Sequence, residues 1–249
     1  MRKYGLIGYP LNYSFSKTYF MEKFRKEKIE DVEYLNFPLE KVDDFVALCK
    51  GDSLIRGFNV TIPYKESIIK HLDALSDAAR EIKAVNTICY CKKSANTALV
   101  GHNTDVTGFR RSLKENIKES PQRAIVLGTG GSSKAVRYVL EELNTKIILV
   151  SSSGKQGAIS YNELTKELLD SVSLVVNTTP LGMYPNVDQS PDIPYKYLND
   201  KHLLFDLVYN PEETLFLKKG KKQNAKTVNG YDMLIYQAEA SWDIWNRNK

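Results

Sequence analysis

Four polar segments in the first half of the sequence carry the hydroxyl and amide groups that a small polar ligand needs. They are Tyr13–Ser16, Asn59–Lys65, Ala84–Thr87 and Gly101–Asp105. Each lies at the end of a run of residues that predicts a strand. Because open α/β sheets bind ligands outside the carboxyl ends of their strands, we expect these segments to surround one ligand, such as a polyol acid. Taken singly, each could be a helix cap or a turn, and their joint placement favours binding.

A glycine-rich turn in the second half predicts a dinucleotide site. The residues from Gly128 to Ser133 follow the predicted strand 124–127 and open a helix with apolar residues at helical spacing. In such turns the first two glycines permit the tight bend and the close approach of a pyrophosphate, which the helix N-terminus then faces. Ser133, a small residue, stands where a third glycine is usual. A βα turn that needs small residues only for packing is the alternative.

The end of the next predicted strand, 146–150, bears on the choice between the two nicotinamide dinucleotides. An acidic residue there would accept a hydrogen bond from the ribose 2′-hydroxyl of NAD. The sequence instead has three hydroxyls and a cation: Ser151, Ser152, Ser153 and Lys155. These groups suit a 2′-phosphate and favour NADP, although no arginine is present to clamp the phosphate. A plain polar turn is the competing interpretation, and NAD use stays open.

Composition excludes several classes of protein. The chain has 249 residues, 42% hydrophobic and 26% charged, as in ordinary globular domains. It has no apolar run long enough to span a membrane. The three cysteines and three histidines lack metal-ligand spacing, so we expect neither a disulfide framework nor a metal site. The N-terminus has no signal-peptide pattern, and we expect a cytoplasmic protein.

The charge pattern gives no sign of a nucleic-acid surface. The net charge is +5, and the densest basic run, Lys218–Lys222, follows apolar residues. We interpret this run as the last turn of a helix that Gly220 ends. A nucleic-acid surface would need basic residues spread along a face with aromatic residues between them. We therefore expect a small-molecule ligand, with neither nucleic acid nor membrane as partner, and the sequence leaves open whether the chain forms a homodimer.

The elements that must position these groups alternate between strand and helix along most of the chain, which predicts an α/β fold with parallel sheets built from βαβ units. The predicted strands are 4–7, 33–37, 57–60, 87–91, 99–100, 124–127, 146–150, 174–176 and 203–208. The predicted helices are 16–26, 39–49, one that begins near Asp105, one after the glycine turn, and 231–245. We divide the chain into a first domain, 1–104, rejoined by the C-terminal helix 231–249, and a second domain, 105–230.

In this order, the motifs resemble those of the shikimate dehydrogenase family. The segments that carry the resemblance are Gly8–Ser16, Asn59–Lys65, Ala84–Thr87, Gly101–Asp105, Gly128–Ser133, Asn177–Met183, Asp206–Pro211 and Asn229–Ala238. They extend over essentially the whole chain. The resemblance implies two α/β domains, an N-terminal substrate domain and a Rossmann-like dinucleotide-binding domain, with the active site in the cleft between them. It also implies NADP-dependent interconversion of 3-dehydroshikimate and shikimate, in the biosynthesis of chorismate and the aromatic amino acids.

The resemblance also implies roles for individual residues. The catalytic pair would be Lys65 and Asp105. The substrate would be held by Ser14, Ser16, Thr61, Asn86, Tyr209 and Gln237, with Tyr209 also near the nicotinamide. The cofactor would be held by Gly128, Gly130, Gly131, Ser132 and Ser133 at the pyrophosphate, by the serine turn, and by Thr178, Met183 and Gly230.

In the reaction that the resemblance implies, hydride moves from NADPH to the C3 carbonyl of 3-dehydroshikimate, and negative charge develops on the ketone oxygen. An ammonium at Lys65 would stabilise that charge and donate a proton. A carboxylate at Asp105 would favour the charged lysine, so we expect Asp105 mainly to orient Lys65 and to bind a ring hydroxyl.

The sequence departs from the family pattern at several positions. Tyr13 replaces a histidine and Lys17 a proline beside the two serines, the serine turn replaces Asn-Arg-Thr, and Asp232 replaces a glycine. These departures leave the cofactor preference and substrate affinity open. The alternatives are a quinate/shikimate dehydrogenase that uses NAD or both cofactors, and a non-catalytic regulator that binds NADP or a metabolite on the same scaffold. Retention of Lys65 and Asp105 argues against a pure binding protein.

Overall fold

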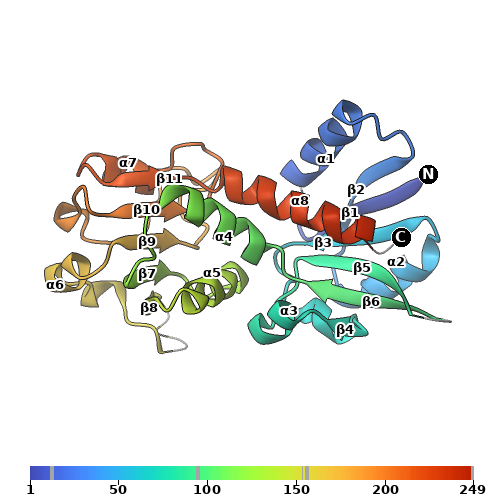
Figure 1. Ribbon diagram of the computed structural model, residues 1–249, viewed down its shortest axis with the longest axis horizontal. Helices are drawn as coiled ribbons and strands as arrows, with labels where there is room; N and C mark the ends of the chain where they lie inside the picture. Colours follow the sequence, from blue (N-terminus) through green and yellow to red (C-terminus); the bar gives the residue numbers. More distant parts are fainter. Residues whose placement is uncertain (12–13, 94–95, 153, 155–156, 248–249) are drawn as a thin grey trace. The chain divides into compact units, whose positions relative to one another are not determined.

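The computed structural model describes residues 1–11, 14–93, 96–152, 154 and 157–247, and it divides into two compact units (Figure 1). Unit 1 comprises Met1–Thr104 and Ala238–Lys249, and unit 2 comprises Asp105–Gln237. The chain passes from unit 1 to unit 2 between Thr104 and Asp105. It returns inside helix α8 (Tyr231–Arg247), later than the residue 231 expected from the sequence.

Unit 1 contains a six-stranded mixed sheet in the order β2-β1-β3-β5-β6-β4. The strands are β1 (Arg2–Gly8), β2 (Val32–Pro38), β3 (Ile55–Val60), β4 (Ala74–Leu75), β5 (Thr87–Lys93) and β6 (Asn96–His102). Strand β1 is parallel to β2 and β3, whereas β5 is antiparallel to β3 and β6. The expectation of a parallel sheet is therefore wrong for β5 in this unit. A parallel connection needs a crossover of about a dozen residues, and the short link between β5 and β6 allows only a hairpin.

Aromatic side chains form the core on one face of this sheet. Tyr4 stacks on Trp245 with ring centroids 4.6 Å apart, and Phe20 stacks on Tyr34 at the same separation. Along β1, Tyr4 and Leu6 belong to this cluster, whereas Ile7 belongs to the cluster on the other face. This alternation is the period of a strand buried on both faces. The helices that supply these residues are α1 (Phe15–Lys26) and the C-terminal half of α8.

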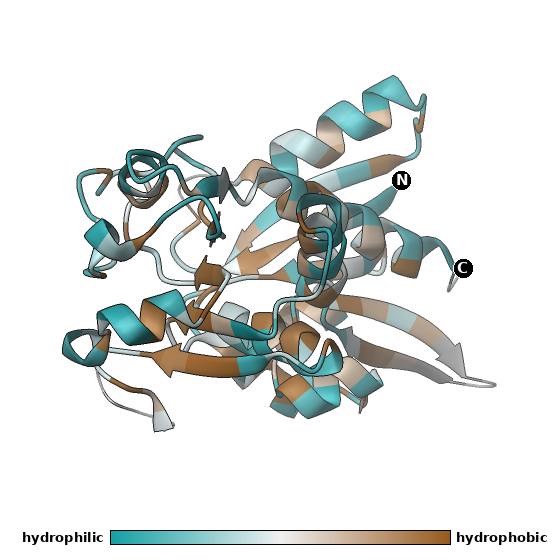
Figure 2. Ribbon diagram, turned by 60° about the vertical axis from the view of Figure 1, so that its left-hand side comes forward, coloured by the Kyte–Doolittle hydropathy of each residue, from teal (hydrophilic) through white to brown (hydrophobic). Residues whose placement is uncertain are grey.

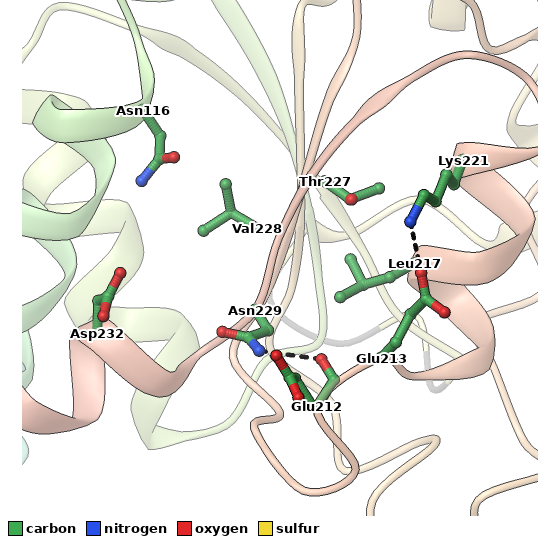
Figure 3. Close-up of a pocket in the computed structure, with 9 residues that line it drawn as sticks. All are labelled: Asn116, Glu212, Glu213, Leu217, Lys221, Thr227, Val228, Asn229 and Asp232. Atoms are coloured by element: carbon green, nitrogen blue, oxygen red, sulfur yellow. Dashed lines mark hydrogen bonds and ion pairs between the residues drawn. The ribbon is translucent and has the colours of Figure 1, made fainter.

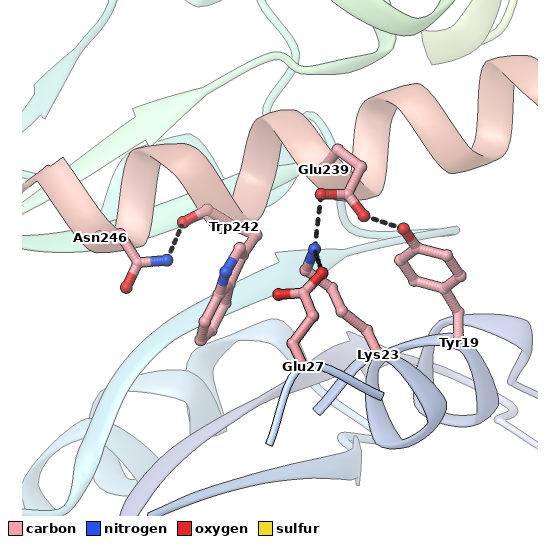
Figure 4. Close-up of polar contacts among 6 residues, drawn as sticks. All are labelled: Tyr19, Lys23, Glu27, Glu239, Trp242 and Asn246. Atoms are coloured by element: carbon pink, nitrogen blue, oxygen red, sulfur yellow. Dashed lines mark hydrogen bonds and ion pairs between the residues drawn. The ribbon is translucent and has the colours of Figure 1, made fainter. Parts of the chain in front are cut away.

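A polar contact also joins α1 to α8 in unit 1 (Figure 4). Lys23 Nζ lies 2.8 Å from a carboxylate oxygen of Glu239 and 2.6 Å from Glu27. The Tyr19 hydroxyl donates to the other oxygen of Glu239. Burial acts to lower the pKa of Lys23, but the two carboxylates outweigh it and raise that pKa. The C-terminal segment of the chain is therefore held to unit 1 by charge as well as by its tryptophans.

The other face of the sheet packs against shorter elements. They are the 3₁₀ helices η1 (Val42–Asp44) and η2 (Ser67–His71) and the helices α2 (Phe45–Gly51) and α3 (Asp77–Ile82). The expected helix over 39–49 is thus a 3₁₀ turn followed by a short helix. Strand β4 was not expected, because two residues carry no readable period.

Unit 2 contains a five-stranded parallel sheet in the order β11-β10-β9-β7-β8. The strands are β7 (Arg123–Leu127), β8 (Lys146–Val150), β9 (Leu174–Asn177), β10 (Leu203–Asp206) and β11 (Lys226–Val228). The helices are α4 (Asp105–Asn116), α5 (Gly131–Glu142), α6 (Lys166–Asp170) and α7 (Leu215–Lys221), with the short 3₁₀ helices η4 (Tyr161–Glu163) and η5 (Tyr195–Tyr197). This is the Rossmann-like arrangement, and the α/β fold class is confirmed.

The core of unit 2 follows the sequence pattern closely. The central strands β7, β9 and β10 are almost entirely buried, as parallel strands covered on both faces must be, whereas the edge strands β8 and β11 are partly exposed. Figure 2 shows hydrophobic colouring concentrated on strands. One prediction in this unit is wrong. Gly220 lies inside α7, which continues to Lys221, and so does not end the helix. An added Cβ at Gly220 would lie 2.3 Å from Leu204 Cδ2. This glycine therefore allows the helix to approach β10.

The described residues contain neither a membrane-spanning helix nor a cluster of metal-ligating side chains. None of their helices is long and apolar enough to cross a membrane. No group of three or more His, Cys, Asp or Glu among them is placed to hold a metal ion.

Candidate functional site

The two serines expected to bind substrate lie at the N-terminus of α1. Ser14 is the N-cap of the helix, and its Oγ accepts a hydrogen bond from the backbone N–H of Lys17 at 3.2 Å. This bond uses a lone pair and leaves the Ser14 proton for another acceptor. Ser16, in the first turn, is within hydrogen-bonding reach of the buried Tyr34 hydroxyl. Lys17 is exposed. Tyr13 lies outside the described residues.

Lys65 lies in a tight loop between β3 and η2. The loop is fastened at both ends: Thr61 N–H donates to Ile7 O at 2.9 Å, and Val85 N–H donates to Lys65 O at 2.7 Å. Between them, Tyr64 is buried, and its hydroxyl donates to Leu39 O at 2.5 Å. The Lys65 side chain remains partly exposed. The backbone that carries this lysine is therefore held firmly while its side chain is accessible.

Asn86 is the most buried of the expected substrate ligands in unit 1, with 2% exposure. Its Oδ1 accepts the backbone N–H of Thr104 at 2.6 Å and lies 3.1 Å from the Thr104 hydroxyl. Asn86 immediately precedes β5, and Thr104 follows β6, so the hairpin brings the two residues together. Thr104 in turn immediately precedes Asp105.

Asp105 begins α4, and it is 6% exposed. A carboxylate in the first turn of a helix is stabilised by the positive end of the helix dipole. Asp105 is one of the two expected catalytic residues, and it lies at the first crossing between the units.

The glycine turn of unit 2 has the backbone that a pyrophosphate site needs. Gly128 has a φ of +105°, which side chains rarely adopt, and a Cβ there would lie 2.8 Å from Thr178 Oγ1. Gly130, in contrast, has no heavy atom within 4 Å of an added Cβ, so the space above it is open. Gly131 and Ser132 form the start of α5, and both are partly buried. The turn therefore has one position, Gly128, whose backbone conformation favours glycine, and another, Gly130, with open space above it.

Ser133 adds a polar atom to this turn. It is 1% exposed, and its Oγ is buried with no hydrogen-bond partner among the described residues. A buried hydroxyl without a partner is costly, and a ligand with acceptor oxygens would satisfy it. The residues present thus fit a phosphate group at the N-terminus of α5.

Thr178 connects the glycine turn to the neighbouring strand. Its Oγ1 donates to Leu127 O at 2.6 Å, and its N–H donates to the same oxygen at 2.9 Å. Leu127 ends β7 and Thr178 follows β9, the two strands between which the chain order of the sheet reverses. Ligands bind at such switch points in open α/β sheets.

Asp206, which was not among the expected site residues, organises the adjacent loops. It is fully buried at the end of β10, and its carboxylate accepts hydrogen bonds from Asn177 Nδ2 at 2.9 Å, Val208 N–H at 3.0 Å and Thr214 Oγ1 at 2.5 Å. Asn177 Oδ1 also accepts from Thr179 N–H at 3.0 Å. One carboxylate thus secures the segments on either side of it. Asn177 and Asp206 both lie in sequence segments that resemble the family, but their burial could not be predicted from the sequence.

The remaining residues that we expect to bind the cofactor differ in how exposed they are. Ser151 is 6% exposed and Ser152 is exposed, so Ser152 is the more accessible hydroxyl of the two. Ser153 and Lys155 lie outside the described residues. Met183 is 44% exposed. Gly230 is buried against Leu207, where a Cβ would lie 2.1 Å from the backbone oxygen, so this glycine is required by packing.

Tyr209 and Gln237 complete the expected set in unit 2. Tyr209 is partly buried and follows the Asp206-bound Val208 by one residue. Gln237 is 9% exposed, and its Nε2 donates to Leu234 O at 2.9 Å on the preceding turn of α8. That bond orients the carboxamide of Gln237, so its oxygen faces away from the Leu234 carbonyl.

Asp232 is exposed in the first turn of α8, where the helix dipole favours an acid. It lines a surface groove of about 570 Å³ together with Asn116, Glu212 and Asn229 (Figure 3). No expected site residue lines this groove. The departure from the family pattern at this position therefore has a local explanation in helix stability.

Comparison with known proteins supports the interpretation of these motifs. Residues 6–88 match the family model described as the shikimate dehydrogenase substrate binding domain. The chain is 38% identical to a shikimate dehydrogenase (NADP(+)) of Methanococcus vannielii, with 97% of this chain and 90% of the relative covered. It is 41% identical to that of Clostridium beijerinckii, over 98% and 92% of the two chains.

A solved structure shows the same similarity in three dimensions. It is the shikimate 5-dehydrogenase of Thermus thermophilus in complex with NADP(H) and shikimate, which is 29% identical to this chain. The two structures superpose with a TM-score of 0.83, over 98% of this chain and 93% of the other.

Proposed function

Because the chain belongs to the shikimate dehydrogenase family, we propose that it catalyses the reversible NADPH-dependent reduction of 3-dehydroshikimate to shikimate. Unit 1 is then the substrate-binding domain and unit 2 the NADP-binding domain. The product serves the biosynthesis of chorismate and the aromatic amino acids, and we place the enzyme in the cytoplasm, where NADPH is available.

The residues of unit 2 fit the cofactor that this reaction needs. NADPH, when bound, supplies the hydride. The open space above Gly130 and the unpartnered Oγ of Ser133 support a pyrophosphate site at the N-terminus of α5. The exposed hydroxyl of Ser152 is available for the 2′-phosphate. Thr178, Met183 and Gly230 belong to the segments beside the same end of the sheet, where we place the rest of the cofactor.

Lys65 is the residue that we expect to handle the proton. Its Nζ would hydrogen-bond the C3 carbonyl oxygen, stabilise the negative charge that develops there, and then donate a proton to that oxygen. In the reverse direction, the neutral amine would take the proton from the C3 hydroxyl. Asp105 would orient the lysine and accept a hydrogen bond from a ring hydroxyl.

The hydroxyl and amide groups of the chain suit a polyhydroxy acid. Ser14 retains a proton to donate after it has capped α1, and a carboxylate is an acceptor that it could reach. Thr61, Ser16, Asn86, Tyr209 and Gln237 are the other expected ligands. None of these groups needs a metal ion to bind a hydroxyl.

The near-complete coverage of a 38% identical shikimate dehydrogenase (NADP(+)) is the observation that carries this proposal. Lys65 and Asp105 stand in the sequence segments that resemble the family. The test is a set of initial rates with shikimate or quinate, each with NADP⁺ or NAD⁺. We expect the highest kcat/KM with shikimate and NADP⁺. A higher kcat/KM with quinate or with NAD⁺ would replace the assigned specificity, and no turnover in any combination would favour a binding protein.

A further inference from the structure

Two of the three cysteines lie side by side on strand β5 of unit 1. Cys89 and Cys91 are alternate residues of this strand, so their side chains project from the same face of the sheet. Their sulfur atoms lie 2.8 Å apart, within hydrogen-bonding distance, and both are reduced thiols. We call these two residues the β5 thiol pair.

The two thiols differ in how well a reagent can reach them. Cys89 is 1% exposed and belongs to the aromatic cluster that contains Tyr4 and Trp245, whereas Cys91 is partly exposed. Burial raises the pKa of the Cys89 thiol, and the neighbouring Cys91 raises it further, so Cys89 stays protonated. Because oxidants attack thiolates that they can reach, we expect the first oxidation to occur at Cys91.

The backbone separation of the pair allows a covalent bridge. A strand rises about 3.3 Å per residue, so the Cα atoms of alternate residues lie about 6.6 Å apart. Disulfides join Cα atoms up to about 6.8 Å apart. The pair lies at the upper end of that range, and a disulfide there should be readily reduced by a small dithiol.

The surroundings of the pair favour a disulfide over other oxidised forms of cysteine. Sulfenic and sulfinic acids are polar or charged, and keeping them beside the aromatic cluster costs the free energy of their desolvation. A disulfide carries no charge and has no hydrogen to donate. The second thiol of the pair is close enough to convert a sulfenic acid to that apolar product before a further oxidation.

A nitrogen base lies within reach of the buried thiol. His102 Nε2 is 3.5 Å from Cys89 Sγ, and burial lowers the pKa of His102. The imidazole is therefore neutral at neutral pH, and one nitrogen of a neutral imidazole is a proton acceptor. This position suits a base that assists Cys89 when its sulfur acts as a nucleophile.

We propose that the β5 thiol pair is an oxidation site, at which a peroxide forms a disulfide between Cys89 and Cys91. With hydrogen peroxide, Cys91 Sγ takes one oxygen atom as the O–O bond breaks, which gives a sulfenic acid and one water. Cys89 Sγ then displaces the hydroxyl group from Cys91 Sγ and forms the S–S bond. The hydroxyl group leaves as a second water with the proton that Cys89 loses. Two thiols are oxidised and one peroxide is reduced, and neither shikimate nor NADPH takes part.

The test is oxidation of the reduced, folded protein with hydrogen peroxide, followed by denaturation, alkylation of the remaining thiols and mass spectrometry. Wild type should lose two of its three alkylatable thiols together, with the loss of two hydrogen atoms from the intact mass. Peptide mapping should place the cross-link between Cys89 and Cys91. Treatment with dithiothreitol should restore all the thiols.

Single substitutions separate the two roles within the pair. In Cys89→Ser, oxidation should stop at a sulfenic acid on Cys91, which dimedone traps. In Cys91→Ser, no bridge should form, and Cys89 should remain alkylatable. The matched control is Cys49→Ser, which removes the third, partly exposed cysteine and should form the bridge as wild type does.

Several outcomes would overturn the proposal, and those of wild type need no variant to fold. One is loss of the Cys49 thiol while the pair stays reduced. Another is oxidation of Cys91 to a sulfinic acid without a cross-link. A disulfide between two chains, seen as a dimer on a non-reducing gel, would also overturn it, as would three intact thiols at a peroxide concentration that oxidises free cysteine.

Discussion

Nδ2 of Asn177 donates to Oδ1 of Asp206 across 2.9 Å, and this contact joins the ends of two neighbouring strands in unit 2. Asn177 ends β9 and Asp206 ends β10, so the bond ties the segments that lead to Thr178 and to Tyr209. The carboxylate receives two further donors from Val208 and Thr214. Three donors favour the ionised acid, whereas complete burial disfavours it, and the outcome of that competition can be measured.

The ionisation of Asp206 should appear in the pH dependence of stability. Burial raises the pKa of Asp206 to about 6, although the bonds from Thr214, Val208 and Asn177 act to lower it. Because the pKa in the folded state is above the unfolded value of about 3.9, the folded state binds more protons between these values. The contribution of this group to stability is therefore largest below about pH 4 and falls as pH rises through about 6.

The matched variant for this prediction is Asp206→Asn, which cannot titrate. The free energy of unfolding of wild type minus that of the variant should fall by about 2 kcal/mol between pH 4 and pH 7. Urea denaturation across that range measures it. A difference that increases with pH would show that the three hydrogen bonds outweigh burial.

Two glycines of the same turn should respond differently to alanine. Gly130→Ala should fold with an unchanged melting temperature, since its Cβ meets no heavy atom within 4 Å. It should nevertheless raise the dissociation constant for NADPH by about tenfold, because the methyl group takes the space where a pyrophosphate approaches. Fluorescence titration with NADPH measures this, and undiminished affinity would place the pyrophosphate elsewhere.

Gly128→Ala should instead destabilise the fold. The φ of +105° is strained for alanine, and its Cβ would lie 2.8 Å from Thr178 Oγ1. The expected loss of unfolding free energy is about 1–3 kcal/mol, measured by urea denaturation. A variant as stable as wild type would mean that the turn can relax.

Lys65→Ala tests the proton donor. We expect kcat to fall by about 10²- to 10⁴-fold while the dissociation constant for shikimate stays near that of wild type. Lys70→Ala is the control, because Lys70 is an exposed lysine of η2 that pairs with Asp43 at 2.7 Å. Steady-state kinetics of both variants measure kcat. A kcat of Lys65→Ala close to that of wild type would show that Lys65 is not the proton donor.

Ser152→Arg tests whether the serine turn faces the 2′-phosphate. A guanidinium there can bind a phosphate through two hydrogen bonds, so KM for NADPH should fall by about threefold or more. KM for NADH, which has no 2′-phosphate, should not change. An equal effect on both cofactors, or on neither, would mean that this residue does not contact the phosphate.

The sequence predicted well those features that depend on neighbouring residues. The period of β-branched and apolar residues located β7, β8 and β9 within a residue or two, and the apolar residues on one side of the predicted helix 16–26 located α1. The shorter elements β4 and β11 were not predicted, because two or three residues carry no period. The direction of β5 was also missed, since strand direction depends on the length of the connecting segments.

By itself, the sequence predicted the glycine turn, because the chemistry of that short motif follows from its own residues. It also showed the motifs whose resemblance to a known family implied the candidate catalytic residues. Only the tertiary structure decided which polar residues are buried and what they bind. Asn59 and Ser241 lie 182 positions apart in the chain, yet Asn59 Nδ2 is 2.9 Å from Ser241 Oγ. The partner of a buried polar group is set by the packing of remote elements, and no local pattern records it.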